Sequence, residues 1–164
     1  MDLLNQLDIY INAQKGVGFQ AFLFGFGLLL SALLFHLLGS SALSEGIRTG
    51  SIVCGILLFG MGFGLRMSQE NIRKEKSVLF QKDPIEFKQS ERERMEKVKN
   101  NYPNYQLVMA IVILVLLLFY FFIKIPFWQG VAISVILFMI GNMFIEYFSQ
   151  KTVLAYYEFL KELF

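Results

Sequence analysis

Four polar or ionisable side chains lie within or beside strongly apolar stretches, where chemistry would be unusual and costly. They are His36, Arg66, Asn142 and Glu146. Glu146 follows Asn142 by four residues, so a helix would present both on one face. A charge at the centre of the hydrocarbon costs about 2.5–3.5 kcal/mol on insertion scales, so such a group usually faces protein or water. We treat these four residues as a candidate polar membrane site.

Each of these groups has a structural and a functional interpretation. Glu146 is expected to form a structural ion pair with Arg66 or Lys151, and the other interpretation is an ion or proton site. His36 precedes a turn that carries Glu45 and Arg48. It is either a hydrogen-bonded histidine at the membrane surface or a pH-sensitive group, since an unperturbed histidine titrates near ~6.5.

The sequence has few residues for metal or cofactor chemistry. With 1 His and 1 Cys in 164 residues, no zinc cluster with the usual ligand spacing is possible. The glycine-rich segment 60–64 resembles a nucleotide loop only in composition, because it lies inside an apolar run with no strand before it. We therefore predict no cofactor, no metal and no enzymatic activity. The net charge of +2 is too small to suggest nucleic-acid binding.

Four apolar runs must position these side chains, and each approaches the ~20 residues that an α-helix needs to cross a bilayer. The chain is also 55% hydrophobic. We predict an all-α integral membrane protein with one membrane domain, residues 1–164, built as a bundle of four transmembrane helices in contact with membrane lipids. The expected spans are 17–38, 47–65, 107–123 and 127–148.

Positive charge is concentrated in the link 66–105, between the second and third spans. It holds ten of the 15 Lys and Arg residues: Arg66, Arg73, Lys74, Lys76, Lys82, Lys88, Arg92, Arg94, Lys97 and Lys99. The positive-inside rule places this link in the cytoplasm, and four spans then place both termini there too. We expect the protein to lie in a membrane of the bacterial inner-membrane type.

The link is expected to form a cytoplasmic helical hairpin. Asp83 and Pro84 are typical of a helix start, and Pro103 predicts that this second hairpin helix ends near Asn100. The terminal segments 1–16 and 149–164 carry apolar residues at helical spacing. They predict amphipathic helices that either lie along the headgroup surface or pack on the hairpin.

Small residues predict where the spans approach one another closely. The expected helix-packing positions are Gly25, Gly50, Gly55, Gly60, Gly64, Gly130, Ser134 and Gly141. The span 107–123 has only Ala110 as a small residue, so it should face lipid over much of its surface. The same small-residue patterns would also serve a homo-oligomer.

Three classes of function follow from these observations. The first is a non-enzymatic small membrane protein that binds a protein partner, for example an immunity protein against a membrane-acting toxin. The second is an oligomeric ion channel or pore-forming effector, for which Ser31, His36, Asn142 and Glu146 would be the polar lining. A membrane enzyme is the third, and a bilayer conductance measurement separates the second from the first.

Overall fold

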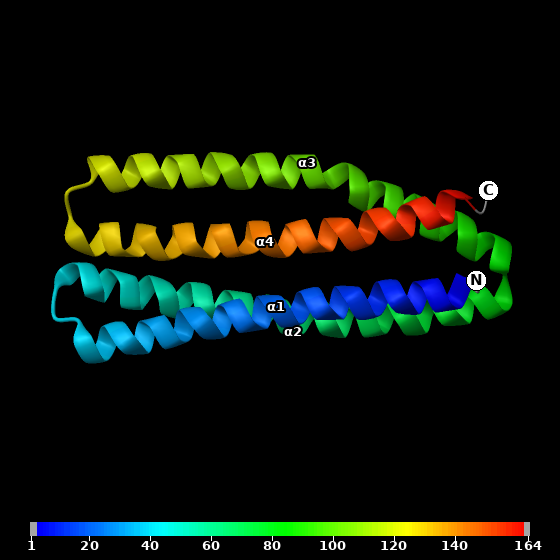
Figure 1. Cartoon of the computed structure of the whole chain (residues 1–164), viewed down its shortest axis with the longest axis horizontal. Helices are drawn as coiled ribbons and strands as arrows, with labels where there is room; N and C mark the ends of the chain where they lie inside the picture. The colour runs from blue at the N-terminus through cyan, green and yellow to red at the C-terminus, as the bar shows by residue number, and fades with distance from the viewer. Residues whose placement is uncertain (1–2, 163–164) are drawn as a thin grey trace.

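The computed structural model describes residues 3–162 and consists of long helices joined by short turns. In chain order they are α1 (Leu3–Leu38), α2 (Ala42–Lys82), α3 (Pro84–Phe122) and α4 (Pro126–Glu162). All four helices are long and apolar enough to span a membrane. They lie along one long axis, and the first and last described turns lie at the same end (Figure 1). The prediction of an all-helical chain with four candidate spans is therefore confirmed.

Every helix is longer than a bilayer requires. The shortest has 36 residues and the longest 41, which correspond to about 54 and 62 Å at ~1.5 Å per residue. The hydrocarbon core is about 30 Å thick. The molecule thus divides along its axis into an apolar half, which contains the four predicted spans, and a charged half. The charged half comprises residues 3–16, 66–82, 84–106 and 149–162.

The connection between α2 and α3 is a single residue, Asp83, and α3 begins at Pro84, where the sequence predicted a helix start. The Asp83 Oδ1 atom accepts hydrogen bonds from the backbone N–H groups of Ile85, at 2.9 Å, and Glu86, at 3.0 Å. Pro84 follows as the first residue of α3, where its missing N–H costs nothing. This cap fixes the turn that folds α3 back along α2.

The predicted end of the hairpin helix near Asn100 is wrong. α3 continues through Pro103 to Phe122 without interruption. A proline inside a helix removes one backbone hydrogen bond and commonly bends the helix rather than ending it. Figure 1 shows α3 changing direction between its charged and apolar halves. Packing on both sides of Pro103 therefore outweighs the local preference of the sequence.

The two terminal segments are not separate amphipathic helices. They are the beginning of α1 and the end of α4, and their apolar faces pack on the hairpin. The sequence left two arrangements open, and in the structure the terminal segments pack on the hairpin. Residues 1–2 and 163–164 lie outside the described residues. The resulting core of the charged half contains Leu3, Leu7, Tyr10, Ile11, Phe87, Met95, Tyr102, Val153, Tyr156, Tyr157 and Leu160.

The apolar half is arranged less symmetrically. α1, α2 and α4 all pack against one another, whereas α3 packs chiefly on α4. No residue in the most apolar 18-residue stretch of α3 is buried inside the described chain. The third span is thus exposed within the described chain, whereas its contact with lipid stays a prediction. The apolar half is therefore a three-helix core with a fourth helix attached to one side.

Candidate functional site

A buried ionic cluster lies at the centre of the charged half. Glu91 on α3 is completely buried, and its carboxylate is bound by Arg94 and Lys76. The Arg94 Nε–H donates to Glu91 Oε2 at 3.0 Å, and a second guanidinium N–H donates to Oε1. The Lys76 ammonium on α2 lies 3.4 Å from Glu91 Oε2 and donates to Ser90 Oγ at 3.3 Å. Two cations thus compensate one buried anion.

Two tyrosines extend this cluster to the terminal segments. The guanidinium of Arg94 lies 5.6 Å from the centre of the Tyr10 ring, and Tyr10 stacks on Tyr156 with centroids 4.7 Å apart. Burial raises the pKa of both tyrosines above the ordinary value. For Arg94, burial favours a lower pKa, but the hydrogen bonds and charge of Glu91 outweigh this and raise it. The cluster therefore joins α1, α2, α3 and α4 through fixed charges and neutral phenols.

Sequence reasoning missed Glu91, although a signal was present. Phe87, Glu91, Met95 and Tyr102 are the buried residues of α3. Phe87, Glu91 and Met95 recur every four residues, so they occupy one helical face. A carboxylate on an otherwise apolar face indicates a buried ion pair. The charge density of the whole link concealed this pattern.

A second polar layer lies where the two halves meet. Gln14 on α1 donates from Nε2 to the backbone carbonyl of Ser149 on α4 at 3.2 Å, and the Ser149 hydroxyl donates to Gln14 Oε1 at 3.1 Å. Tyr102 then donates its hydroxyl to Ser149 Oγ at 2.9 Å. Burial raises the pKa of Tyr102 to about 12, although the Ser149 bond opposes the change.

Within the apolar half, hydroxyl groups link three helices. The Ser134 hydroxyl on α4 donates to the backbone carbonyl of Ile47 at 2.9 Å and lies 3.1 Å from Ser51 Oγ on α2. The Ser51 oxygen in turn lies 3.4 Å from Ser31 Oγ on α1. Both Ser51 and Ser134 are fully buried. These hydroxyls therefore bind helix to helix, which accords with the packing position predicted at Ser134.

Most of the predicted glycine positions are close contacts between helices. A Cβ atom at Gly25 would lie 2.7 Å from the Phe59 backbone nitrogen, and one at Gly55 would lie 2.8 Å from Leu29. One at Gly50 would lie 2.7 Å from Ser134, and one at Gly130 only 2.2 Å from the Leu43 carbonyl. Added atoms have no room at these positions. The closest helix pairs are thus α1 with α2 and α2 with α4.

Gly60 and Gly64 require a correction. A Cβ at either position would meet no atom within 4 Å, so neither is a packing position within this chain. The physical reason is that residues two positions apart on a helix point to nearly opposite sides of it. Gly62, between them, faces Gly18 and Phe22 on α1, and so its two neighbours in the pattern face outward. The face of α2 that carries Gly60 and Gly64 is therefore open to the surroundings.

The four residues of the candidate polar membrane site are not brought together. His36 accepts a hydrogen bond at Nδ1 from Arg48, at 3.0 Å, near the turn between α1 and α2. Asn142 donates to the Phe138 carbonyl of its own helix at 2.8 Å. Both residues use their polar atoms locally.

The predicted pairing of Glu146 with Arg66 or Lys151 is wrong. No ion pair of Glu146 occurs within residues 3–162. One turn along, Gln150 accepts a hydrogen bond from Gln106 of α3, so this face of α4 is directed toward α3. Arg66 instead lies beside Gly18 on α1, and the Lys151 ammonium lies 4.6 Å from the Tyr147 ring centre.

An open groove lies between α1 and α4 and has a volume of about 790 Å³. Its walls are Gln20, Leu23, Phe24, Gly27, Leu28 and Ser31 on α1, and Leu137, Ile140, Phe144, Ile145 and Phe148 on α4. The Phe24 ring crosses toward α4, because a Cβ at Gly141 would lie 2.9 Å from it. Gly141 therefore makes room for the aromatic ring.

The described residues contain no group of three or more His, Cys, Asp or Glu side chains that could hold a metal ion. Comparison with known proteins finds no matching family model, no matching curated protein and no matching solved structure.

Proposed function

We propose that this chain is a non-enzymatic membrane protein that binds another protein through the open face of α3. An immunity protein that guards a membrane against a membrane-acting toxin is the concrete form that we favour. The main support is the isolation of α3 in the apolar half, where its most apolar stretch has no buried residue. The other three helices already form a packed core without it.

The open face of α3 has the composition of a contact surface rather than of a pore lining. Ile111, Leu114, Val115 and Leu118 are each exposed by half or more. Association in lipid depends on van der Waals packing and on hydrogen bonds, because lipid tails are as apolar as leucine. A partner helix of complementary shape would be held on this face by its branched side chains.

The rigid charged half supplies the base for such a surface. We infer that it lies in the cytoplasm with both termini, because it holds ten of the 15 Lys and Arg residues in the link 66–105. The turns 39–41 and 123–125 would then be the parts outside a bacterial inner membrane. Reporter fusions after Phe164 and within the link at Asp83 should give the same cytoplasmic signal. A periplasmic signal from either fusion would reverse the orientation.

An oligomeric ion channel is the second candidate, and one observation favours it. Glu146 is half-buried near the junction of the two halves and makes no ion pair within the described chain. Gly60 and Gly64 leave a second open face, on which copies of the chain could approach closely. In such an assembly the Glu146 carboxylate would select which ions pass. A current across a planar bilayer, altered by Glu146→Gln, would favour this candidate over the first.

The first test of the immunity proposal is genetic. A gene for a secreted, membrane-acting toxin should neighbour the gene for this chain, and expression of the chain should protect cells from that toxin. Leu114→Trp, on the open face of α3, should reduce protection. Leu57→Trp, on the exposed side of α2, is the matched control and should retain it.

Two results would count against this proposal. Equal protection by the Leu114 and Leu57 variants would show that α3 is not the contact surface. Failure of the normal protein to protect, at a level of expression similar to that of an active immunity protein, would contradict the immunity form.

A further inference from the structure

The groove between α1 and α4 has the length and position of one bilayer leaflet. On α1 its lining runs from Gln20 to Ser31, which is about 16 Å at ~1.5 Å per residue. One leaflet accounts for half of the ~30 Å hydrocarbon thickness. The groove begins close to the charged half and ends near the middle of the apolar half. On α4 it stops at Leu137, at the middle of the span 127–148, whereas on α1 it continues to Ser31, past the middle of the span 17–38.

The two walls are matched stripes from antiparallel helices. Residues 20, 23, 24, 27, 28 and 31 occupy one face of α1, and 137, 140, 144, 145 and 148 occupy one face of α4. Leu28 and Ile145 are buried in the core and form the floor. Leu23 and Phe144 are half-exposed and form the rims. A flexible apolar chain would contact both helices along the whole groove.

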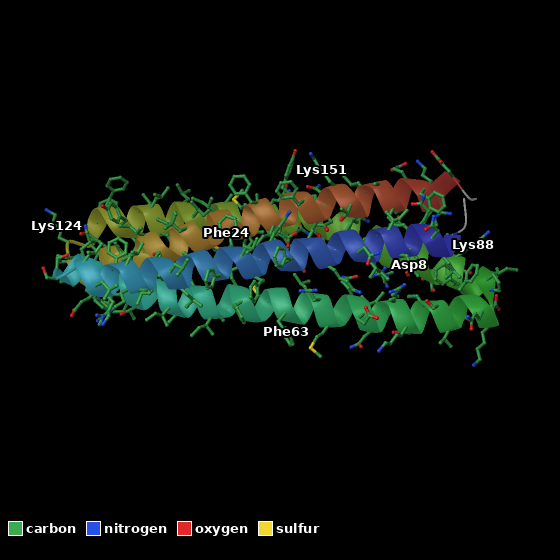
Figure 2. All side chains as sticks on the ribbon, turned by 60° about the horizontal axis from the view of Figure 1, so that its bottom comes forward. Asp8, Phe24, Phe63, Lys88, Lys124 and Lys151 are labelled. Carbon is green, nitrogen blue, oxygen red and sulfur yellow. The ribbon has the colours of Figure 1, made fainter. Side chains whose placement is uncertain are left out.

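Polar groups occur at the end of the groove that is nearest the charged half. The Gln20 Oε1 atom is buried and has no hydrogen-bond partner among residues 3–162. An unpartnered buried polar atom is costly, so a donor at this point would be bound favourably. One turn beyond Phe148, the exposed side chain of Lys151 continues the α4 stripe. Figure 2 shows Lys151 on the side of Phe24 that lies toward Asp8 and Lys88, in the charged half.

From these observations we propose that the groove binds one phospholipid from the leaflet adjacent to the charged half. One acyl chain lies along the groove between Gln20 and Ser31. The headgroup phosphate lies near Lys151, whose ammonium supplies an opposite charge, and a headgroup hydroxyl or ammonium donates to Gln20 Oε1. The inference requires only that the apolar half lies in a bilayer, and it is independent of the proposed protein partner.

Two open glycines provide a matched pair of variants. A Cβ at Gly27, in the groove, or at Gly60, on the outer side of α2, would meet no atom within 4 Å. Gly27→Leu should therefore fill the groove without displacing a helix. Gly60→Leu should add the same bulk elsewhere. Both variants should unfold at the temperature of the normal protein in detergent.

Native mass spectrometry after exchange into lipid-free detergent tests the proposal. The normal protein and Gly60→Leu should each retain one phospholipid, and Gly27→Leu should lose it. Lys151→Glu should also reduce retention, because it places a negative charge beside the phosphate. No retained phospholipid in the normal protein, or equal retention in the two glycine variants, would refute the site. Unchanged retention in Lys151→Glu would refute the headgroup contact.

A second measurement is independent of how Gly27→Leu folds. In a Trp128→Phe background, Phe144→Trp places the fluorophore on the groove rim, and Leu57→Trp places it on the open side of α2. After loading with brominated phospholipid and dilution into detergent, quenching should persist at position 144 and disappear at position 57. Equal loss at both positions contradicts a bound lipid.

A helix from a second copy is the competing occupant. In a Cys54→Ser background, Leu23→Cys on the groove rim should give no disulfide-linked dimer in vesicles made from the same phospholipid. A cross-linked dimer at this position would assign the groove to a second copy and overturn the lipid proposal.

Discussion

The two halves of the molecule are built from the same four helices but are held together in different ways. In the charged half, α1, α2, α3 and α4 close around buried apolar side chains and around the carboxylate of Glu91. In the apolar half, glycine contacts and serine hydroxyls hold α1, α2 and α4, while α3 is attached only at one side. With the charged half outside the membrane, as we propose, water would drive the first arrangement by the hydrophobic effect. Lipid provides no such force, so close approach determines the second.

The difference shows which part of the chain is fixed and which is free to bind. A closed core with compensated charges gives the charged half one arrangement. The apolar half leaves an entire helix face and a groove uncovered. Substitutions should therefore act through buried charge in one half and through steric contact in the other.

The largest effect should come from the ionic cluster. Glu91→Ala leaves Arg94 and Lys76 without their shared anion, and breaking a buried ion pair in this way costs roughly 3–5 kcal/mol. Because the Arg94 and Lys76 side chains are partly accessible to water, we expect the free energy of unfolding to fall by about 3 kcal/mol. The midpoint of unfolding in detergent, followed by circular dichroism, measures it. Glu93→Ala, an exposed residue one half-turn away, should leave the midpoint unchanged. Equal unfolding midpoints for Glu91→Ala and Glu93→Ala would show that the ionic cluster does not stabilise the charged half.

Steric contact in the apolar half should give the next largest effect. Gly25→Ala forces a Cβ to within 2.7 Å of the Phe59 backbone, and overpacking of this kind costs about 1–3 kcal/mol. Gly60→Ala adds the same atom where nothing lies within 4 Å and should cost no stability. Thermal unfolding of the two variants in the same detergent compares them. A loss of stability in Gly60→Ala would reveal a contact with another molecule.

The hydroxyl link should contribute less. Ser134→Ala removes the bonds to Ile47 and Ser51, and hydrogen bonds between membrane helices average about 0.6 kcal/mol, with a maximum of ~1.7. We expect a loss within this range, measured by unfolding in detergent. Ser40→Ala, at an exposed turn, serves as the control. A loss well above this range would mean that serine bonds, rather than glycine contacts, hold the apolar half.

The smallest effect should appear only at alkaline pH. Burial raises the pKa of Tyr102 from 10.0 to about 12, so the folded protein keeps this proton longer than the unfolded chain does. The stabilisation is complete below pH 10 and declines as the pH rises toward 12. Tyr102→Phe should make the unfolding midpoint less dependent on pH in this range. An unchanged pH dependence would place the alkaline transition at Tyr10 and Tyr156 instead.

The elements were predictable from local sequence, because apolar runs and caps act within one helix. The runs located the four candidate spans, and Asp83 with Pro84 located the turn between α2 and α3. Pro103 misled the prediction, since the packing of α3 on both sides of the proline was not visible locally. The absence of small residues after Ala110 did indicate that the third span is exposed.

The sites were less predictable, because they depend on which helix faces which. Gly25 and Gly60 belong to similar small-residue patterns, but only Gly25 meets a neighbouring helix. Glu91 is buried because the ends of α1 and α4 return to cover the hairpin, which its own segment cannot reveal. Glu146 was predicted to pair with Arg66 or Lys151, but Arg66 lies beside Gly18 on α1 and the Lys151 ammonium lies over the Tyr147 ring, which the sequence of α4 alone does not reveal. The groove depends on the spacing of two antiparallel helices and had no signal in either helix alone.

All four helices run without a break from one half into the other. This limits the bilayer thickness that the protein can fit. A single span can tilt to fit a thinner or thicker bilayer at modest cost. Here the charged half clamps the four helices as one unit, so an independent tilt of α1, α2 or α4 would disturb the packing around Glu91. The surrounding lipid must then stretch or compress instead, and this cost favours a bilayer whose thickness already matches the protein. With the charged half outside the bilayer, as we propose, this constraint would favour membranes whose thickness matches the apolar half.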